Sequence, residues 1–282
     1  MASILSQMSD YLYRIGAFLR FYKKATNVYG IHSPFVFDFV QNVLDESKEY
    51  YAYKSIEIER QKLLLNRKMI QVDDFGAGSK NSLTNATSRH INDIARTSLS
   101  SSKKGRILFQ IAHHYKRMKI LELGTSLGIS SAYLASANSQ SQLYTLEGSV
   151  EIAKIAESVH SHLKLKNIHY LIGRFSDTLP TLLNDTFDLV FLDGHHEYNA
   201  VLAYFEILRP SLSQDAIVIV DDIYWSKGME KAWNELKQQD IVTASVDLFD
   251  MGILFLRSGL SKQDFCIVPY HLKPWKLGVW GK

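Results

Sequence analysis

The chain has 282 residues, of which 46% are hydrophobic, and a formal net charge of +3. This composition is sufficient for one large α/β domain with an appended region, and no apolar run approaches the roughly 20 residues that a membrane-spanning helix needs. The small net charge, without a clustered basic face, argues against a nucleic-acid partner, and the single cysteine, Cys266, excludes an intramolecular disulfide and predicts a reducing, cytoplasmic location.

The N-terminal part of the chain, residues 1–104, is expected to form a helical region that covers or shapes a substrate site. Its first helix, over residues 1–24, repeats apolar residues at helical intervals, and the basic residues mostly fall off this stripe, which consists of Ile4, Met8, Leu12, Ile15 and Leu19. We expect this helix to dock on the protein or on a partner subunit, with a membrane surface as the alternative. The pair Ser33-Pro34 is typical of an N-cap followed by the first helical residue, which predicts a helix that ends near Asp45.

A segment with two glycines, residues 69–79, imitates a ligand-binding loop (MIQVDDFGAGS). No strand that ends in an acid follows this segment at a suitable distance. We therefore expect these residues to form an ordered turn near the mouth of the active site and not the ligand-binding loop.

Residues 119–135, KILELGTSLGISSAYLA, are predicted to form a strand, a glycine loop and a helix. The apolar run with one acid at residues 120–123 is typical of a buried parallel strand. Glycines bracket the turn, where a missing side chain lets the backbone approach a ligand, and the helix that follows offers free N–H groups to an anionic group. Ser126 and Ile129 stand where a dinucleotide-binding loop would have its second and third glycines, which argues against a pyrophosphate ligand.

The loop follows the pattern Glu-x-Gly-x-x-x-Gly. It resembles the first motif of class I S-adenosylmethionine-dependent methyltransferases, and its ELG-x-x-x-G-x-S form is most similar to their small-molecule, catechol-type O-methyltransferases. The resemblance covers about residues 105–257 and implies S-adenosylmethionine as the cofactor. The loop residues that it implies as cofactor contacts are Glu122, Gly124, Thr125, Ser126 and Gly128.

A second predicted strand, residues 143–147, ends in Glu147 and is followed by Gly148. An acid at the end of this strand can accept the hydrogens of both ribose hydroxyls. The loop and this acid together favour a nucleoside-containing cofactor, and an ordinary βαβ crossover is the alternative. Glu147 and Gly148 therefore join the expected cofactor-binding residues.

Helices and strands alternate after Glu147, which predicts a parallel sheet with helices on both faces and ligands at the carboxyl ends of its strands. Residues 242–249 and 252–257 read as two strands joined by a corner so short that they must be antiparallel. This ending resembles the seven-stranded methyltransferase sheet. The predicted fold is α/β, with a Rossmann-like, seven-stranded, mostly parallel sheet, an antiparallel edge strand and a helical N-terminal region. The other expected elements are helices over 107–115, 149–163, 178–183, 198–208 and 229–237, and strands over 168–172, 187–192 and 217–220.

Further site candidates follow the third and fourth strands. By resemblance, Phe175 and Ser176 flank the adenine ring, although residues of a surface loop would look similar. Asp193 should point into the ligand crevice as a cofactor contact and catalytic residue, and the pattern D-G-x-H-x-Y that it begins resembles one branch of the small-molecule O-methyltransferases. His196 is the candidate general base, with His195 as the alternative.

The fifth strand ends in Asp221 and Asp222, whose charges would repel one another unless a cation or hydrogen bonds compensate them. Together with Asp193 they offer a set of oxygen ligands suitable for Mg²⁺. In the alternative, Asp222 caps the following turn and Asp221 bonds to the backbone.

We expect residues 105–258 to form a methyltransferase domain that acts on a hydroxyl of a small molecule, and residues 259–282 to be an extension to which no role can be assigned. A bound metal would lower the pKa of that hydroxyl and orient it. The expected partner is a small-molecule substrate, without nucleic acid or a membrane span, and association into a homo-oligomer is left open. The alternatives are a nicotinamide-dependent oxidoreductase, which the missing glycines disfavour, and a catalytically silent cofactor-binding protein.

Overall fold

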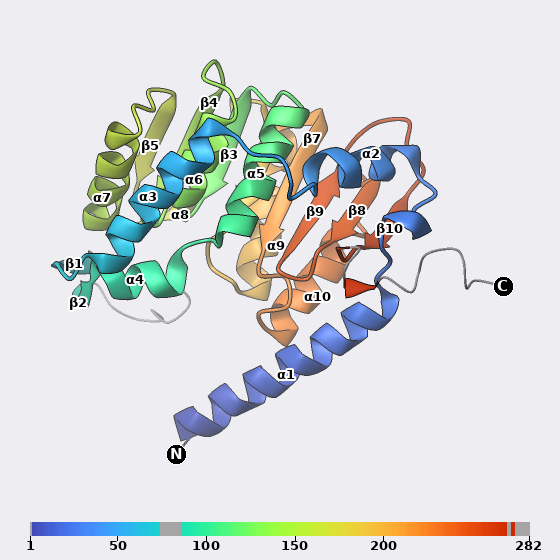
Figure 1. Ribbon diagram of the computed structural model, residues 1–282, viewed down its shortest axis with the longest axis horizontal. Helices are drawn as coiled ribbons and strands as arrows, with labels where there is room; N and C mark the ends of the chain where they lie inside the picture. The colour runs from blue at the N-terminus through green and yellow to red at the C-terminus, as the bar shows by residue number, and fades with distance from the viewer. Residues whose placement is uncertain (1, 74–85, 270–271, 274–282) are drawn as a thin grey trace. The chain divides into compact units, whose positions relative to one another are not determined.

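A computed structural model describes residues 2–73, 86–269 and 272–273, without the side chains of residues 2–9, 73 and 86. The chain divides into two compact units. Figure 1 labels the helices and strands. Unit one comprises residues 1–44, 195–209 and 213–282, and unit two comprises residues 45–194 and 210–212. The units alternate along the chain, whereas the regions expected from the sequence are consecutive.

Unit two contains a parallel sheet that holds the predicted glycine loop. Its strand order is β6-β3-β4-β5, and all three pairings are parallel. The last four residues of β3 are completely shielded from solvent, as its apolar sequence predicts. These strands confirm the expected parallel core; their bounds are β3 (Lys119–Leu123), β4 (Gln142–Glu147), β5 (Ile168–Ile172) and β6 (Phe187–Leu192).

The helices of unit two bury the loop's own helix, α6, at the centre of this layer. Both α3 and α5 pack against α6 (Figure 1). A Cβ on Gly105 of α5 would lie 2.3 Å from Cδ2 of Tyr133 on α6, so only glycine permits the two helices to approach this closely. The bounds are α3 (Tyr51–Leu65), α4 (Ile91–Ser98), α5 (Ser102–His114), α6 (Ile129–Ser136), α7 (Val150–His162) and α8 (Phe175–Thr178), with short 3₁₀ turns at Leu179–Leu182 and Arg209–Ser211.

The N-terminal part of the chain is not wholly helical. Strands β1 (Met69–Asp73) and β2 (Ala86–His90) pair antiparallel as a separate two-stranded sheet. The expected turn at residues 69–79 was therefore wrong over residues 69–73, which form a strand. Its remaining part lies outside the described residues.

Unit one contains a mixed set of paired strands. Its strand order is β10-β8-β9-β7, in which β9 is antiparallel to both β7 and β8 and β10 is parallel to β8. The predicted antiparallel corner is thus confirmed, and β10 is a further strand that was not predicted from the sequence. The strand bounds are β7 (Leu212–Asp221), β8 (Ala244–Asp247), β9 (Met251–Phe255) and β10 (Gln263–Cys266), and the helix bounds are α1 (Ala2–Lys24), a 3₁₀ turn (Val28–Gly30), α2 (Pro34–Val43), α9 (Tyr198–Leu208) and α10 (Lys227–Leu236).

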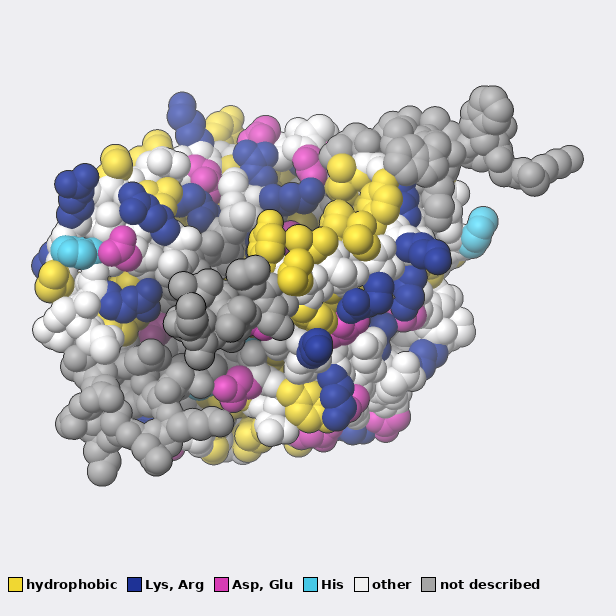
Figure 2. All heavy atoms as spheres, turned by 90° about the horizontal axis from the view of Figure 1, so that it is seen from below, with side chains coloured by type: hydrophobic (Ala, Val, Ile, Leu, Met, Phe, Trp, Pro, Cys, Tyr) yellow, Lys and Arg dark blue, Asp and Glu magenta, His cyan; other side chains and the backbone are white. Residues whose placement is uncertain are grey.

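Helix α1 docks within unit one, but not through the predicted stripe. Its docked row is Tyr13, Ala17 and Phe21, of which Ala17 is 0% and Phe21 is 3% exposed, and the Tyr13 hydroxyl donates to Glu230 of α10 at 2.5 Å. Figure 2 shows hydrophobic side chains gathered on this side of the molecule. The exposed apolar side chains of α1 are Tyr11, Leu12, Ile15, Phe18 and Leu19. In the described part of the chain, no helix combines the length and the apolar character that crossing a membrane requires.

Candidate cofactor site

The glycine loop connects β3 to α6 at the carboxyl end of the parallel strands of unit two. Gly124 has φ +102°, and a Cβ at this position would lie 2.4 Å from the carbonyl oxygen of Asp193. The Asp193 N–H donates to the carbonyl of Leu123 at 3.0 Å, which fixes this close approach. A glycine is therefore required here both by backbone conformation and by the neighbouring strand end.

Glu147, at the end of β4, ties the loop to the strand beside it. One carboxylate oxygen accepts the N–H of Ser126 at 2.9 Å, and the other accepts the N–H of Ser149 at 3.0 Å. Burial raises the pKa of Glu147, while these backbone donors oppose the rise. Each carboxylate oxygen can accept more than one hydrogen bond, so the carboxylate retains capacity for ligand hydroxyls. The loop and the acid that the sequence paired are thus joined directly.

Glu122 lies beneath the loop and is completely buried. Its Oε2 accepts the hydroxyls of Ser131 and Thr145, the second at 2.7 Å, whereas Oε1 has no hydrogen-bond partner among the described residues. Burial raises the pKa of Glu122 to about 7, with the nearby hydroxyls opposing the rise. The Thr145 hydroxyl hydrogen is used on Glu122, so the hydroxyl of Thr125, 2.6 Å away, donates to Thr145.

Two side chains that shape the loop were not expected from the sequence. Thr145 lies inside β4 and continues the hydrogen-bond chain from Thr125 to Glu122. His160 of α7 is 1% exposed, and its Nε2 lies 2.7 Å from the carbonyl oxygen of Gly128 at the loop's end. Neither residue belongs to a sequence pattern that would have marked it.

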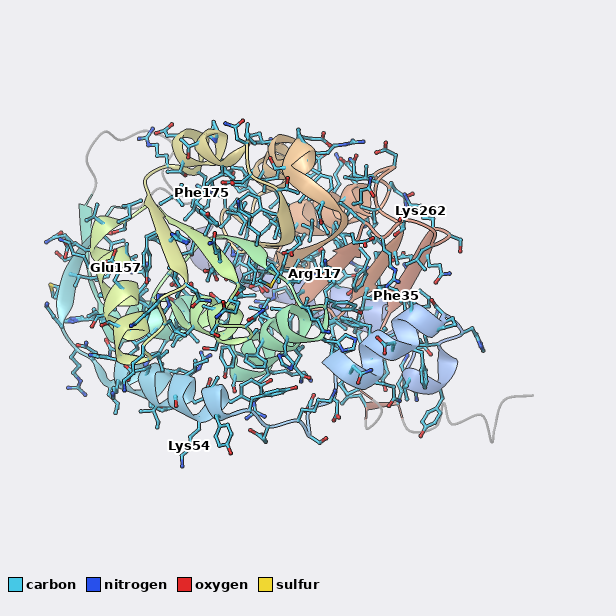
Figure 3. The ribbon with its side chains drawn as sticks, turned by 90° about the horizontal axis from the view of Figure 1, so that it is seen from above. Phe35, Lys54, Arg117, Glu157, Phe175 and Lys262 are labelled. Carbon is cyan, nitrogen blue, oxygen red and sulfur yellow. The ribbon has the colours of Figure 1, made fainter. Side chains whose placement is uncertain are left out.

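Of the two residues expected to contact adenine after β5, Phe175 is buried and Ser176 is exposed. Phe175, labelled in Figure 3, is 8% exposed, and a Cβ on Gly194 would lie 2.5 Å from its Cε2 atom. The ring therefore packs against the backbone that follows β6. Ser176 is exposed, and its hydroxyl donates to Asp177 at 2.9 Å.

The two candidate bases, His195 and His196, belong to unit one. His195 has φ +50°, and its Nδ1 forms a 2.9 Å hydrogen bond with the hydroxyl of Tyr204 on α9. His196 is half-buried. His195 thus has a backbone conformation that is rare for residues other than glycine, and such conformations occur often at functional sites.

Asp221 is the last residue of β7 in unit one, and Asp222 follows it. Asp221 is 4% exposed, and Asp222 has φ +50° with its N–H donating to the carbonyl of Asp250 at 2.9 Å. Over the residues that the structure describes, no group of three or more His, Cys, Asp or Glu side chains is placed to hold a metal ion. The predicted metal set of Asp193, Asp221 and Asp222 therefore stays a prediction.

Comparisons with known proteins agree with this fold and loop. A family model described as a methyltransferase domain matches residues 121–223. The catechol O-methyltransferase of Mycobacterium tuberculosis is 30% identical over 154 residues, which cover 54% of this chain and 68% of the relative. An O-methyltransferase of Aspergillus hancockii is 29% identical over 121 residues, 41% of this chain and 48% of the relative.

Solved structures show the same fold. The O-methyltransferase TomG from Streptomyces achromogenes, in complex with SAM, aligns with a TM-score of 0.54 at 21% identity, over 78% of this chain and 95% of TomG. An O-methyltransferase from Bacillus cereus in complex with SAH aligns with a TM-score of 0.53 at 18% identity, over 78% and 96% of the two chains. The parallel sheet with a glycine loop and an acid after its second parallel strand defines a nucleoside-binding α/β protein of the methyltransferase class. Within that class, the chain belongs to the S-adenosylmethionine-dependent O-methyltransferase family.

Proposed function

We propose that this protein transfers the methyl group of S-adenosylmethionine to a hydroxyl of a small molecule. The observation that carries the proposal is the joined pair of loop and acid, in which Glu147 binds the N–H of Ser126 and keeps acceptor capacity at the end of a parallel strand. Ligands of open α/β sheets bind at this edge. Family membership favours the same cofactor over a nicotinamide dinucleotide.

Each part of unit two has a distinct proposed role in holding the cofactor. Glu147, beside Gly148, accepts the ribose hydroxyls. The loop from Gly124 to Gly128, with Thr125 and Ser126, faces the methionine portion, because the first N–H groups of α6 suit its carboxylate. Phe175 and Ser176 supply the adenine contacts, with Phe175 offering its ring and Ser176 its hydroxyl.

The proposed reaction is a nucleophilic displacement at the methyl carbon. The acceptor oxygen forms a bond to this carbon while the bond from carbon to sulfur breaks and its electron pair stays on sulfur, which leaves S-adenosylhomocysteine. The hydroxyl proton goes to His196 as the general base. His195, whose Nδ1 forms a hydrogen bond with the hydroxyl of Tyr204, is the alternative base. Asp193, which directly follows β6, is the other proposed catalytic residue.

The sequence also predicts a divalent metal ion at the site. The described residues do not supply a three-ligand group for such an ion, so no step above uses one. We keep Asp193, Asp221 and Asp222 as the residues to examine for a metal requirement, and Asp222→Asn with Asp215→Asn as its control separates a local role from a general charge effect. Turnover that is lost after chelation and restored by Mg²⁺ would reinstate the metal.

The test of the proposal is methyl transfer from isotope-labelled S-adenosylmethionine to a panel of catechols, other phenols and aliphatic alcohols. We expect labelled ether product from at least one acceptor, and a His196→Ala protein that binds S-adenosylhomocysteine normally but loses most turnover. If the protein binds the cofactor without methylating any acceptor, the alternative of a catalytically silent cofactor-binding protein replaces this proposal. A cytoplasmic location, supported by the single free Cys266, belongs to the same proposal.

A further inference from the structure

His160 on α7 joins the cofactor loop to the outermost strand of unit two. Its Nε2 lies 2.7 Å from the carbonyl oxygen of Gly128, and its Nδ1 forms a hydrogen bond with the hydroxyl of Tyr170 on β5. The ring also packs on the loop itself, because a Cβ on Gly128 would lie 2.7 Å from Nε2. Glu157, labelled in Figure 3, marks the same helix one turn earlier.

The chemistry of these partners fixes the state of the imidazole. Burial lowers the pKa of His160 to about 4, so the ring is neutral near pH 7. A carbonyl oxygen can only accept, so Nε2 carries the hydrogen and donates it to Gly128. Nδ1 is then the acceptor of the Tyr170 hydroxyl hydrogen, and the ring cannot turn over without losing both bonds.

The carbonyl that His160 holds is the first acceptor of α6. Gly128 is the N-cap residue of α6, with φ +84°, and it makes no side-chain capping bond. Its carbonyl also accepts the N–H of Ala132 at 3.0 Å. The direction of this peptide group therefore sets how the loop enters the helix and where the free N–H groups at the helix start point.

We propose that His160 is a positioning residue for the cofactor, which holds the end of the glycine loop so that the first turn of α6 receives the amino-acid portion of S-adenosylmethionine. This inference rests on the proposed function. His160 should matter for ligands that carry the amino-acid portion and should not matter for the nucleoside, whose ribose is assigned to Glu147. Tyr170 acts through His160 by holding the ring in place.

The test compares two substitutions that each retain one half of the imidazole. In His160→Gln the side-chain amide reaches as far as Nε2 and keeps a donor for Gly128, whereas in His160→Asn the shorter amide reaches only as far as Nδ1 and keeps contact with Tyr170. Calorimetric titrations use S-adenosylhomocysteine and 5′-methylthioadenosine, which lacks the amino-acid portion. We expect His160→Asn to weaken S-adenosylhomocysteine about tenfold and 5′-methylthioadenosine less than about twofold, and His160→Gln to bind both almost as the unaltered protein does.

Equal loss for the two ligands in His160→Asn, or no loss for either, would overturn the inference. If His160→Asn does not fold, Tyr170→Phe provides the second measurement, since it should weaken S-adenosylhomocysteine selectively by a smaller factor; an unselective effect there would also overturn the inference. A protein with native His160 that binds neither ligand would instead refute the proposed function, so the two failures are distinguishable.

Discussion

Replacing Glu122 by Gln should remove a loss of stability that the unaltered protein shows as pH rises from 5 to 8. Burial raises the pKa of this carboxyl from 4.5 to about 7, so the folded protein binds a proton that the unfolded chain releases in this range. For an acid whose pKa is raised, the free energy of unfolding falls as pH rises between these two values and then stays low. The shift corresponds to about 3 kcal/mol in total, or about 2.5 kcal/mol between pH 5 and pH 8.

Gln is a close substitute for the protonated carboxyl. Its carbonyl can accept the Ser131 and Thr145 hydroxyls at the Oε2 position. Its amide N–H groups take the place of Oε1, which has no hydrogen-bond partner among the described residues, and the cost of burying them does not depend on pH. Urea titrations of both proteins from pH 5 to pH 8 measure the effect. The difference in free energy of unfolding should grow in favour of Glu122→Gln as pH rises, by roughly 2 to 3 kcal/mol.

A matched substitution separates burial from charge removal in general. Glu151 is a partly exposed carboxylate on α7 that pairs with Lys154, so Glu151→Gln should show no such growth with pH. Parallel curves for the unaltered protein and Glu122→Gln would refute the reasoning, because they would mean that Glu122 is ionised at little cost in the folded state.

Two further predictions concern the loop and the first helix. Gly124→Ala should abolish S-adenosylhomocysteine binding and lower the urea midpoint of unfolding, because the added Cβ would clash with the Asp193 carbonyl. The control is Gly259→Ala, where φ is +81° and the space is open, and it should lower the free energy of unfolding by only about 1 kcal/mol. Equal effects of the two substitutions would contradict the steric argument. Ala17→Asp should lower the free energy of unfolding by about 2 to 4 kcal/mol, because it buries a charge on the docked face of α1. Ile15 is 44% exposed, so Ile15→Asp should change this free energy by less than about 0.5 kcal/mol. Urea titration measures both, and similar values would show that this face is not docked.

The central part of the fold could be predicted because local signals and packing agree there. The apolar run at residues 120–123 and the glycines around the turn favour one structure, and the structure forms it. β10 gave no such signal, since four residues, Gln263–Cys266, become a strand only through pairing with β8. The antiparallel pairing of β1 and β2 was not predicted for the same reason, because each strand is short and is defined by its partner.

The site divides in a similar way between motif residues and supporting residues. The position of Glu147 beside the glycine loop was predictable, because Glu147 ends the second strand of the parallel core and the loop follows the first. Its role in cofactor binding stays a prediction. The contacts of His160 were not predictable. A histidine within a helix belongs to no sequence pattern that indicates its burial or its hydrogen bond to a carbonyl group far along the chain. For α1, the sequence showed an amphipathic helix but could not show that Tyr13, Ala17 and Phe21 form the docked row, which depends on what the neighbouring α10 offers.

The most direct test of the account is a calorimetric titration of the unaltered protein and of Glu147→Ala with S-adenosylhomocysteine and with NAD. Removing the carboxylate deletes charge-assisted hydrogen bonds to the ribose that are together worth about 1.5 to 3 kcal/mol, so the Kd for S-adenosylhomocysteine should rise by roughly 10- to 100-fold. Glu151→Ala, a neighbouring carboxylate on α7, should leave the Kd unchanged. Saturable binding of S-adenosylhomocysteine but not NAD, weakened in Glu147→Ala alone, is the predicted result; tight NAD binding, or an unchanged Kd in a folded Glu147→Ala protein, would contradict the central claim.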